Sequence, residues 1–342
     1  MRERARGLLV AAGLAVAFGE LTPAGQVGTA ETHIAAAKAA AGTDHAFMFE
    51  TLCVQALAGL NQPAAPPAVA AQGRGAQPAG PPARATWYAE PVKVFDNLYF
   101  VGQTEFSAWA ITTSAGIIVI DTIFDYSVND EVIEGLRKLG LDPATIKYAI
   151  VSHGHGDHSG GAKALQDRFG TKIILSADDW DLLDRSTGTK PRRDIVATDG
   201  QKLTLGDTTI TLYLTPGHTK GTISTIIPVK DRGQPHVAAY WGGTMFNWIR
   251  NRASYITPTT PDKYWFDIYA SSAARFRDIA ARAGADVLLS NHTNYDGTKQ
   301  KIPQLAMRKA GDPNPYVVGT GAVQRYLTTV GECAQAGSIM SR

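Results

Sequence analysis

This chain has no surplus of charge of one sign, and beyond its N-terminus it has no long apolar run. The 342 residues carry 33 Lys and Arg against 31 Asp and Glu, which gives a formal net charge of +2. There is no basic stripe and no nucleic-acid-binding motif, so nucleic acid is not expected as a partner. Beyond the N-terminus, no apolar run is long enough to cross a membrane. We therefore expect a small-molecule partner.

Cysteine is also scarce. The chain has only Cys53 and Cys333, which lie far apart in the sequence and outside its histidine-rich stretch. Two interpretations remain open. In an exported protein, the pair could form one disulfide that ties the N-terminal part to the C-terminal helix, or both could be buried thiols. Sequence alone does not fix the distance between distant cysteines.

The N-terminus is the exception to the lack of apolar runs. Arg2, Arg4 and Arg6 precede an apolar run from Leu8 to Phe18, and this order is typical of an export signal. We predict a signal peptide over residues 1–20 and export to the periplasm, with no integral membrane segment after cleavage. A short N-terminal helix is the alternative.

Composition divides the remaining chain into three parts. Residues 31–60 are rich in alanine and predict a helical N-terminal extension. Residues 61–86 are rich in Pro, Ala and Gly, which predicts a linker without a core. From residue 87 to about 336, apolar β-branched runs alternate with helical patterns, and this part is the predicted catalytic domain.

One short stretch concentrates the residues that bind metals. Residues 153–161 contain His153, His155, Asp157 and His158, and they lie between a predicted strand and a predicted helix. Imidazole and carboxylate groups are ordinary zinc ligands. In an extended chain, Asp157 and His158 would point apart, which suits two neighbouring centres. A polar loop with chance histidines is the alternative, and the spacing disfavours it.

Further candidates also follow predicted strands. His218 comes after one strand, His292 after another, and Asp121 closes a third. Loops at strand ends are where α/β proteins place functional groups, so these residues are expected to gather at one edge. His33 and His45, in contrast, have no ligand spacing and are expected at the surface.

These motifs together resemble the metallo-β-lactamase superfamily. The resemblance rests on the His-x-His-x-Asp-His motif at 153–158, on Pro216-Gly217-His218, and on His292 after an apolar strand. It implies an α/β (α+β) fold of four layers, an αββα sandwich with two facing sheets, helices outside both, and metals at one edge.

Within the superfamily, the chain is more similar to class B β-lactamases of subclass 3. Residues 97–102, His158 and the segment 311–316 carry this resemblance. Glyoxalase-type hydrolases and lactonases have a Gly-Asp-Thr segment whose aspartate bridges the metals. The chain has Gly242-Gly243-Thr244 instead, without an acid.

The resemblance implies two zinc ions in each chain. The six implied ligands are His153, His155 and His218 for one ion and Asp157, His158 and His292 for the other. Three protein ligands on each ion leave positions open for water and substrate. The implied reaction is attack of a metal-activated water or hydroxide on the amide of a β-lactam, with Asp157 as the catalytic residue.

Two further roles are implied near the ligands. Asp121 would fix the ligand loop from behind, or else be a simple turn residue. Thr244, where subclass 3 has a serine nearby, would bind the substrate carboxylate.

Fold alone does not fix function, and two rival hypotheses remain. The first is another hydrolase on the same scaffold, acting on a lactone, a thioester or an unrelated amide. The second is an exported zinc-binding protein with little turnover. The intact set of six ligands argues against the second hypothesis.

Overall fold

A computed structural model describes residues 28–60 and 80–341. Its strands form a seven-stranded sheet in the order β1 to β7 and a five-stranded sheet in the order β12-β11-β10-β9-β8. The strands are β1 Val92–Lys93, β2 Leu98–Phe100, β3 Trp109–Thr113, β4 Gly116–Ile120, β5 Ile146–Ile150, β6 Lys172–Ser176, β7 Ile195–Ala197, β8 Gln201–Leu205, β9 Thr208–Leu214, β10 Ile223–Asp231, β11 Gln234–Trp241 and β12 Val287–Ser290.

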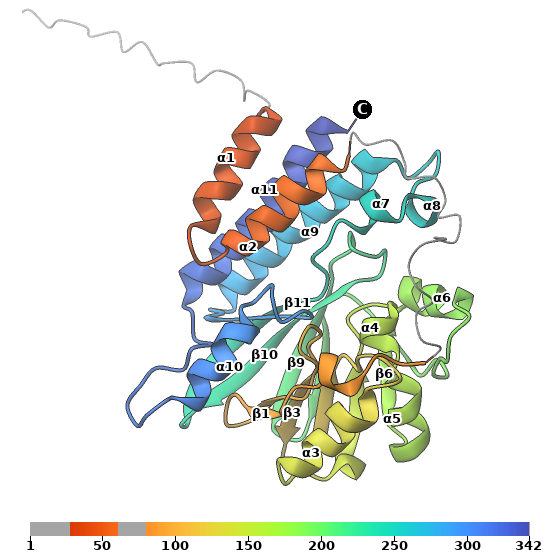
Figure 1. Ribbon diagram of the computed structural model, residues 1–342, viewed down its shortest axis with the longest axis vertical. Coiled ribbons are helices and arrows are strands. Elements are labelled where there is room, and N and C mark those ends of the chain that lie inside the picture. The colour runs from red at the N-terminus through yellow and green to blue at the C-terminus, as the bar shows by residue number, and fades with distance from the viewer. Residues whose placement is uncertain (1–27, 61–79, 342) are drawn as a thin grey trace, which may run out of the picture.

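Helices cover the outer faces of both sheets (Figure 1). They are α1 Ala30–Ala41, α2 Ala46–Phe49, α3 Glu134–Lys138, α4 Gly156–Ser159, α5 Ala162–Phe169, α6 Ala177–Arg185, α7 Asn247–Arg250, α8 Arg252–Tyr255, α9 Asp262–Arg282, α10 Thr298–Ala306 and α11 Thr320–Met340. π-Helical turns at Glu50–Ala56 and Asn129–Ile133 extend α2 and precede α3. Short 3₁₀ turns span Arg84–Thr86 and Pro143–Thr145.

Three apolar clusters separate the layers. Ile111 and Ile118 of the larger sheet pack with Ile210 of the smaller one, and so form the core between the sheets. A second cluster lies between the larger sheet and α3, α5 and α6, and a third lies between the smaller sheet and α1, α9 and α11. Strands β2, β4 and β12 are buried on both faces, which explains their continuous apolar runs. The predicted αββα sandwich is confirmed.

The N-terminal extension packs on this sandwich through α11. Cys53 and Cys333 form a disulfide with a Cα–Cα distance of 4.9 Å, so the first of the two cysteine interpretations holds in the structure. Figure 1 shows α1 lying alongside α11 on the outer face. The alanines of α1 allow this close approach, and Ala37 is fully buried there.

Two sequence-based predictions differ from the structure, namely the end of the last helix and the position of His45. The last helix continues to Met340, past the expected domain end at 336, because its apolar stripe continues with buried Ala336 and Gly337. His45 is 8% exposed and bonds the carbonyl oxygen of Ala322, so its expected surface position was wrong. The predicted signal peptide and most of the predicted linker lie outside the described residues.

Within residues 28–60 and 80–341, no helix is both long enough and apolar enough to span a bilayer.

Candidate metal centre

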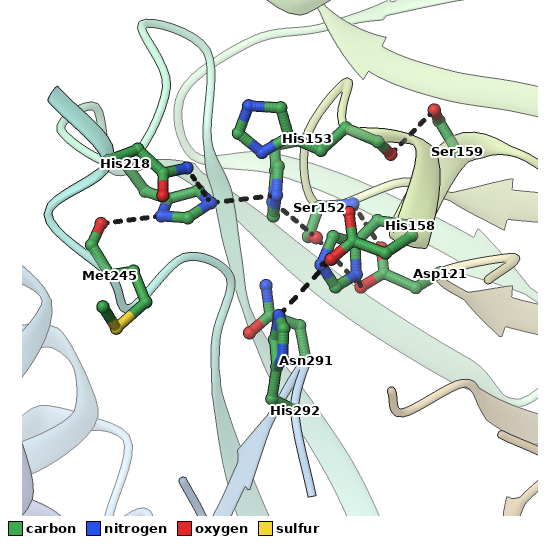
Figure 2. Close-up of polar contacts among 12 residues, drawn as sticks. Asp121, Ser152, His153, His158, Ser159, His218, Met245, Asn291 and His292 are labelled. Carbon is green, nitrogen blue, oxygen red and sulfur yellow. Dashed lines mark hydrogen bonds and ion pairs between the residues drawn. The ribbon is translucent and has the colours of Figure 1, made fainter. Parts of the chain in front are cut away.

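The candidate ligands come from both sheets and meet at one end of them. His153 to His158 follow β5 of the larger sheet, while His218 follows β9 and His292 follows β12 of the smaller sheet. Figure 2 shows the imidazoles of His153, His158, His218 and His292 pointing toward one another. Two sets of three residues place their ligand-type atoms within 4.8 Å of each other, namely His153, His155 and His218, and His153, Asp157 and His158.

Backbone carbonyls fix the orientation of two imidazoles. Nδ1 of His153 donates to the Gly242 oxygen at 3.0 Å, and Nδ1 of His218 donates to the Met245 oxygen at 2.8 Å. Burial lowers the pKa of both histidines well below the usual range, so both are neutral. Their Nε2 atoms therefore carry lone pairs, and these two atoms face each other at 3.1 Å. Such an arrangement suits a shared or neighbouring cation.

The third imidazole is held by a tyrosine. The hydroxyl of Tyr255 donates to the His218 oxygen at 3.0 Å and lies 3.2 Å from Nε2 of His155. Because the hydroxyl proton is already used, Nε2 of His155 is the donor in this contact, which leaves Nδ1 as the ligand atom. Burial lowers the pKa of His155 to about 4, so the ring is neutral near pH 7.

Asp157, His158 and His292 form the other half of the cluster. The Oδ2 atom of Asp157 lies 3.1 Å from Nε2 of His158 and 3.6 Å from Nε2 of His292. The expectation that Asp157 and His158 point apart was wrong, because α4 begins at Gly156 and replaces the extended chain. Burial lowers the pKa of His292 to about 3, which keeps it neutral.

Asp121 lies behind His158 and holds it in place. Its carboxylate is fully buried and accepts four bonds, from Ser152 N (2.6 Å), Ser152 Oγ (2.9 Å), His158 Nδ1 (2.9 Å) and Tyr240 OH (2.6 Å). Its φ of 59° is in the left-handed region, which is uncommon for a side-chain-bearing residue. Strain of this kind persists where surrounding bonds enforce it, which supports the positioning role over that of a simple turn residue.

The charges around His158 favour a cation. Burial alone would lower the pKa of His158, but the carboxylates of Asp157 and Asp121 raise it to about 10. Its Nε2 atom is buried and, among the described residues, has only the ion pair with Asp157 at 3.1 Å, without hydrogen-bond geometry. An unsatisfied buried nitrogen beside a carboxylate, with the opposite ring nitrogen bonded to a second carboxylate, is the usual environment of a metal ligand. The donor set of five imidazoles and one carboxylate therefore fits divalent metal ions.

Sequence patterns did not reveal several supporting residues. Asp179 is buried and joins two ligand loops, since it accepts from Gly154 N at 3.1 Å and from Thr219 Oγ1 at 2.8 Å. Burial raises the pKa of Asp179 to about 7. Tyr240 and Tyr255 were also missed. The only available signal was that a buried tyrosine hydroxyl needs a partner.

The structure gives Thr244 a different place from the one expected. Its side chain is 1% exposed, and its hydroxyl lies 3.5 Å from the Tyr326 hydroxyl inside the protein. A substrate carboxylate at the surface does not reach such a group. The backbone oxygen of Thr244 accepts instead from Tyr269 OH at 2.7 Å, which fixes the loop after β11.

Comparison with known proteins agrees with this geometry. The sequence profile of the metallo-β-lactamase superfamily matches residues 106–232. Hydroxyacylglutathione hydrolase of Synechococcus sp. is 29% identical over 125 residues, or 36% of this chain and 45% of that protein. Metallo-β-lactamase type 2 of Bacillus sp. is 30% identical over 132 residues, or 38% and 49% of the two chains. The chain thus spans about half the length of these relatives.

Among solved structures, BJP-1, a subclass B3 metallo-β-lactamase of Bradyrhizobium japonicum, is similar over 71% of this chain and 91% of its own. It has a TM-score of 0.57 and 28% identity. FEZ-1 from Legionella gormanii, at 24% identity and a TM-score of 0.58, shares the fold over 71% and 92% of the two chains.

A two-sheet sandwich with this ligand cluster at its edge defines a metallo-hydrolase scaffold, and residues 106–232 match the metallo-β-lactamase superfamily. Its structural neighbours include enzymes of subclass B3.

Proposed function

We propose that this protein is a zinc-dependent hydrolase that opens the amide of β-lactam antibiotics and holds two zinc ions in each chain. The superfamily is shared by thioester hydrolases and β-lactamases, so the family alone does not select the substrate. The packing between the two sets of ligands favours a β-lactam over a lactone or a thioester as the substrate.

That space cannot hold a bridging carboxylate from the loop after β11. A Cβ atom on Gly243 would lie 2.5 Å from the Cβ of His218, and one on Gly242 would lie 1.8 Å from the Ile223 oxygen. Neither position accepts a side chain without moving the ligand loops. The sequence has no aspartate here of the kind implied for glyoxalase-type enzymes, and the packing leaves no room for one. Both facts support the similarity to subclass 3.

The groove beside the cluster has a size that suits a small-molecule substrate, and its lining includes two cations beside three aspartates. A cavity of about 590 Å³ opens next to His155, with Tyr255 and Trp265 on one side. Lys220 and Arg185 line it, and neither forms an ion pair within the described parts of the chain. Asp178 and Asp181 also line it, and Asp181 is already paired with Arg193. Two unpaired cations could orient a substrate carboxylate.

The chain's own residues would contribute mainly by positioning. His153, His155 and His218 would hold one ion, and Asp157, His158 and His292 the other. Zinc ions bound in such a site supply a Lewis acid and a water of lowered pKa. Asp157, whose side chain is 22% exposed, is the one carboxylate among the proposed ligands and would orient the attacking water. Tyr255 and Asp121 keep His155 and His158 in the required tautomers.

The test is hydrolysis of a chromogenic cephalosporin by the zinc-loaded protein, with a chelated sample beside it. We expect turnover that the chelator abolishes and that His155→Ala lowers by at least about a hundredfold, since a ligand matters more than its supporting residues. His236→Ala is the matched control. His236 is a strand histidine paired with Asp286 outside the cluster, and its loss should change the rate by less than about threefold.

Absence of turnover in protein that holds two zinc ions would overturn the proposal. Lactones, thioesters and unrelated amides would then be screened with the same variants. If none is hydrolysed, a zinc-binding protein with little turnover becomes the better description.

We also propose export to the periplasm. The charged and apolar order of residues 1–18 and the buried Cys53–Cys333 bridge support it, because structural disulfides persist in oxidising compartments. Mass spectrometry of protein taken from its native cells should find a mature N-terminus beyond the first 20 residues. An intact Met1 would contradict the proposal.

A further inference from the structure

A second cavity lies where the N-terminal extension meets the catalytic domain. Its volume is about 540 Å³, within the range of ordinary small-molecule pockets. Its walls come from the turn between α1 and α2, from α2 itself, from the loop after β12, and from α10 and α11. None of the proposed metal ligands lines it.

One wall of this cavity is apolar. Met48 and Leu288 are 1% and 2% exposed at its floor, while Phe47 is 52% exposed at its side. The ring of Phe47 lies 6.1 Å from that of Tyr295, another lining residue. The exposed ring of Phe47 beside the cavity presents apolar surface that a bound ligand would cover.

The lining also includes an ammonium group that forms no direct ion pair within the described residues. Lys301 of α10 is half-buried, and it forms no hydrogen bond or ion pair with any residue in the described ranges. Its Nζ lies 5.1 Å from the centre of the Tyr316 ring. Asp296 also lines the cavity, but its two oxygens are engaged by Ser290 N at 2.8 Å and Thr298 N at 2.9 Å. Burial lowers the pKa of Lys301, and the charge of Asp296 offsets this effect only in part.

The other polar groups on the walls do not supply that partner. Asp44 is paired with Arg325. His45 donates through Nε2 to the Ala322 oxygen at 2.9 Å, and burial lowers its pKa, so it is neutral. Gln300 and Gln304 of α10 add amide groups at the rim.

We propose that this cavity is a binding site for a small apolar carboxylate. The carboxylate would pair with Lys301, and the apolar body would cover Phe47, Met48 and Leu288. The ring of Tyr295, which forms part of the wall, lies 5.1 Å from the ring of His292. The site therefore neighbours the metal cluster and is separate from it.

Naphthalene-2-carboxylate and its neutral amide are suitable probes, titrated by calorimetry at pH 7 into the metal-loaded and the chelated protein. The carboxylate should bind once per chain in both samples and at least about tenfold more tightly than the amide, because only the anion pairs with Lys301. Binding that disappears with the chelator would be binding to metal and would overturn the proposal.

Two variants locate the site. Lys301→Met should weaken binding of the carboxylate by at least about tenfold and change the affinity for the amide by less than about twofold. Phe47→Ala, at an exposed position that leaves the core intact, should weaken both probes. Lys309→Met is the control, because Lys309 is an exposed lysine just after α10. This variant should change the affinity for neither probe. Equal affinities of Lys301→Met and the parent protein for the carboxylate would refute the assignment.

Discussion

At the scale of single residues, the charge on His158 decides how the cluster responds to pH. Its pKa of about 10, raised by Asp157 and Asp121 against the effect of burial, means that the metal-free protein carries an imidazolium at pH 7. A metal ligand must be neutral, so an entering ion displaces this proton. The affinity of that half of the cluster should therefore rise with pH, by up to about tenfold per unit below pH 10.

Calorimetric titration of zinc at pH 7 in buffers of different ionisation enthalpy would count the released protons. We expect about one proton from His158, and less in Asp121→Asn, because removing that carboxylate lowers the pKa of His158. The same variant should bind zinc about 10 to 100 times more weakly. Asp286→Asn, which alters a similar carboxylate–histidine contact at His236, should behave as the parent does. Buffer-independent heats in the parent protein would contradict this prediction.

At the scale of elements, the disulfide attaches the N-terminal extension to α11. Cys53 and Cys333 are 4% and 0% exposed, and the bridge spans 280 residues of sequence. Cross-links that close long loops restrict the unfolded chain most, so loss of this one should cost roughly 2–4 kcal/mol.

Guanidinium unfolding of the double variant Cys53→Ser/Cys333→Ser would measure that cost. The midpoint should fall relative to the oxidised parent, and added reductant should leave the variant's midpoint unchanged. The parent unfolded with reductant is the control and should approach the variant. Coincident curves for all samples would show that the bridge adds no stability.

The elements also show what the sequence could and could not reveal. The 153–158 motif carried the family resemblance that implied the sandwich. The predicted strand ends placed the candidate ligands at one edge, because strand ends are marked by local signals. Asp179, Tyr240 and Tyr255 act through contacts between elements distant in sequence, which no local pattern records. Thr244 was misplaced for the same reason, since its burial depends on Tyr326 of α11.

At the scale of the whole molecule, the cluster joins the two sheets. Four candidate ligands follow β5 of one sheet, and His218 and His292 follow strands of the other. A bound ion would therefore link the halves of the sandwich, and its binding free energy would add to the stability of the folded state.

Thermal unfolding with and without a chelator tests this link. At free metal one hundred times the dissociation constant, one site adds about 2.7 kcal/mol, so the midpoint should fall by at least about 5 °C when metal is removed. His153→Ala removes a ligand of one of the two proposed ions, so its midpoint should fall by less than that of the parent when the chelator is added. An unfolding midpoint of the parent protein that does not change when metal is removed would argue against this link.

The bridge between Cys53 and Cys333 has one more consequence, for covalent connectivity. Between these residues, backbone and sulfurs form a closed ring, with the remaining residues attached as two tails. A protease that cuts once anywhere inside the ring opens it and releases nothing. The product is one water heavier than the parent and separates into two pieces only after reduction. A nicked molecule would thus stay in one piece on a denaturing gel until thiols are added.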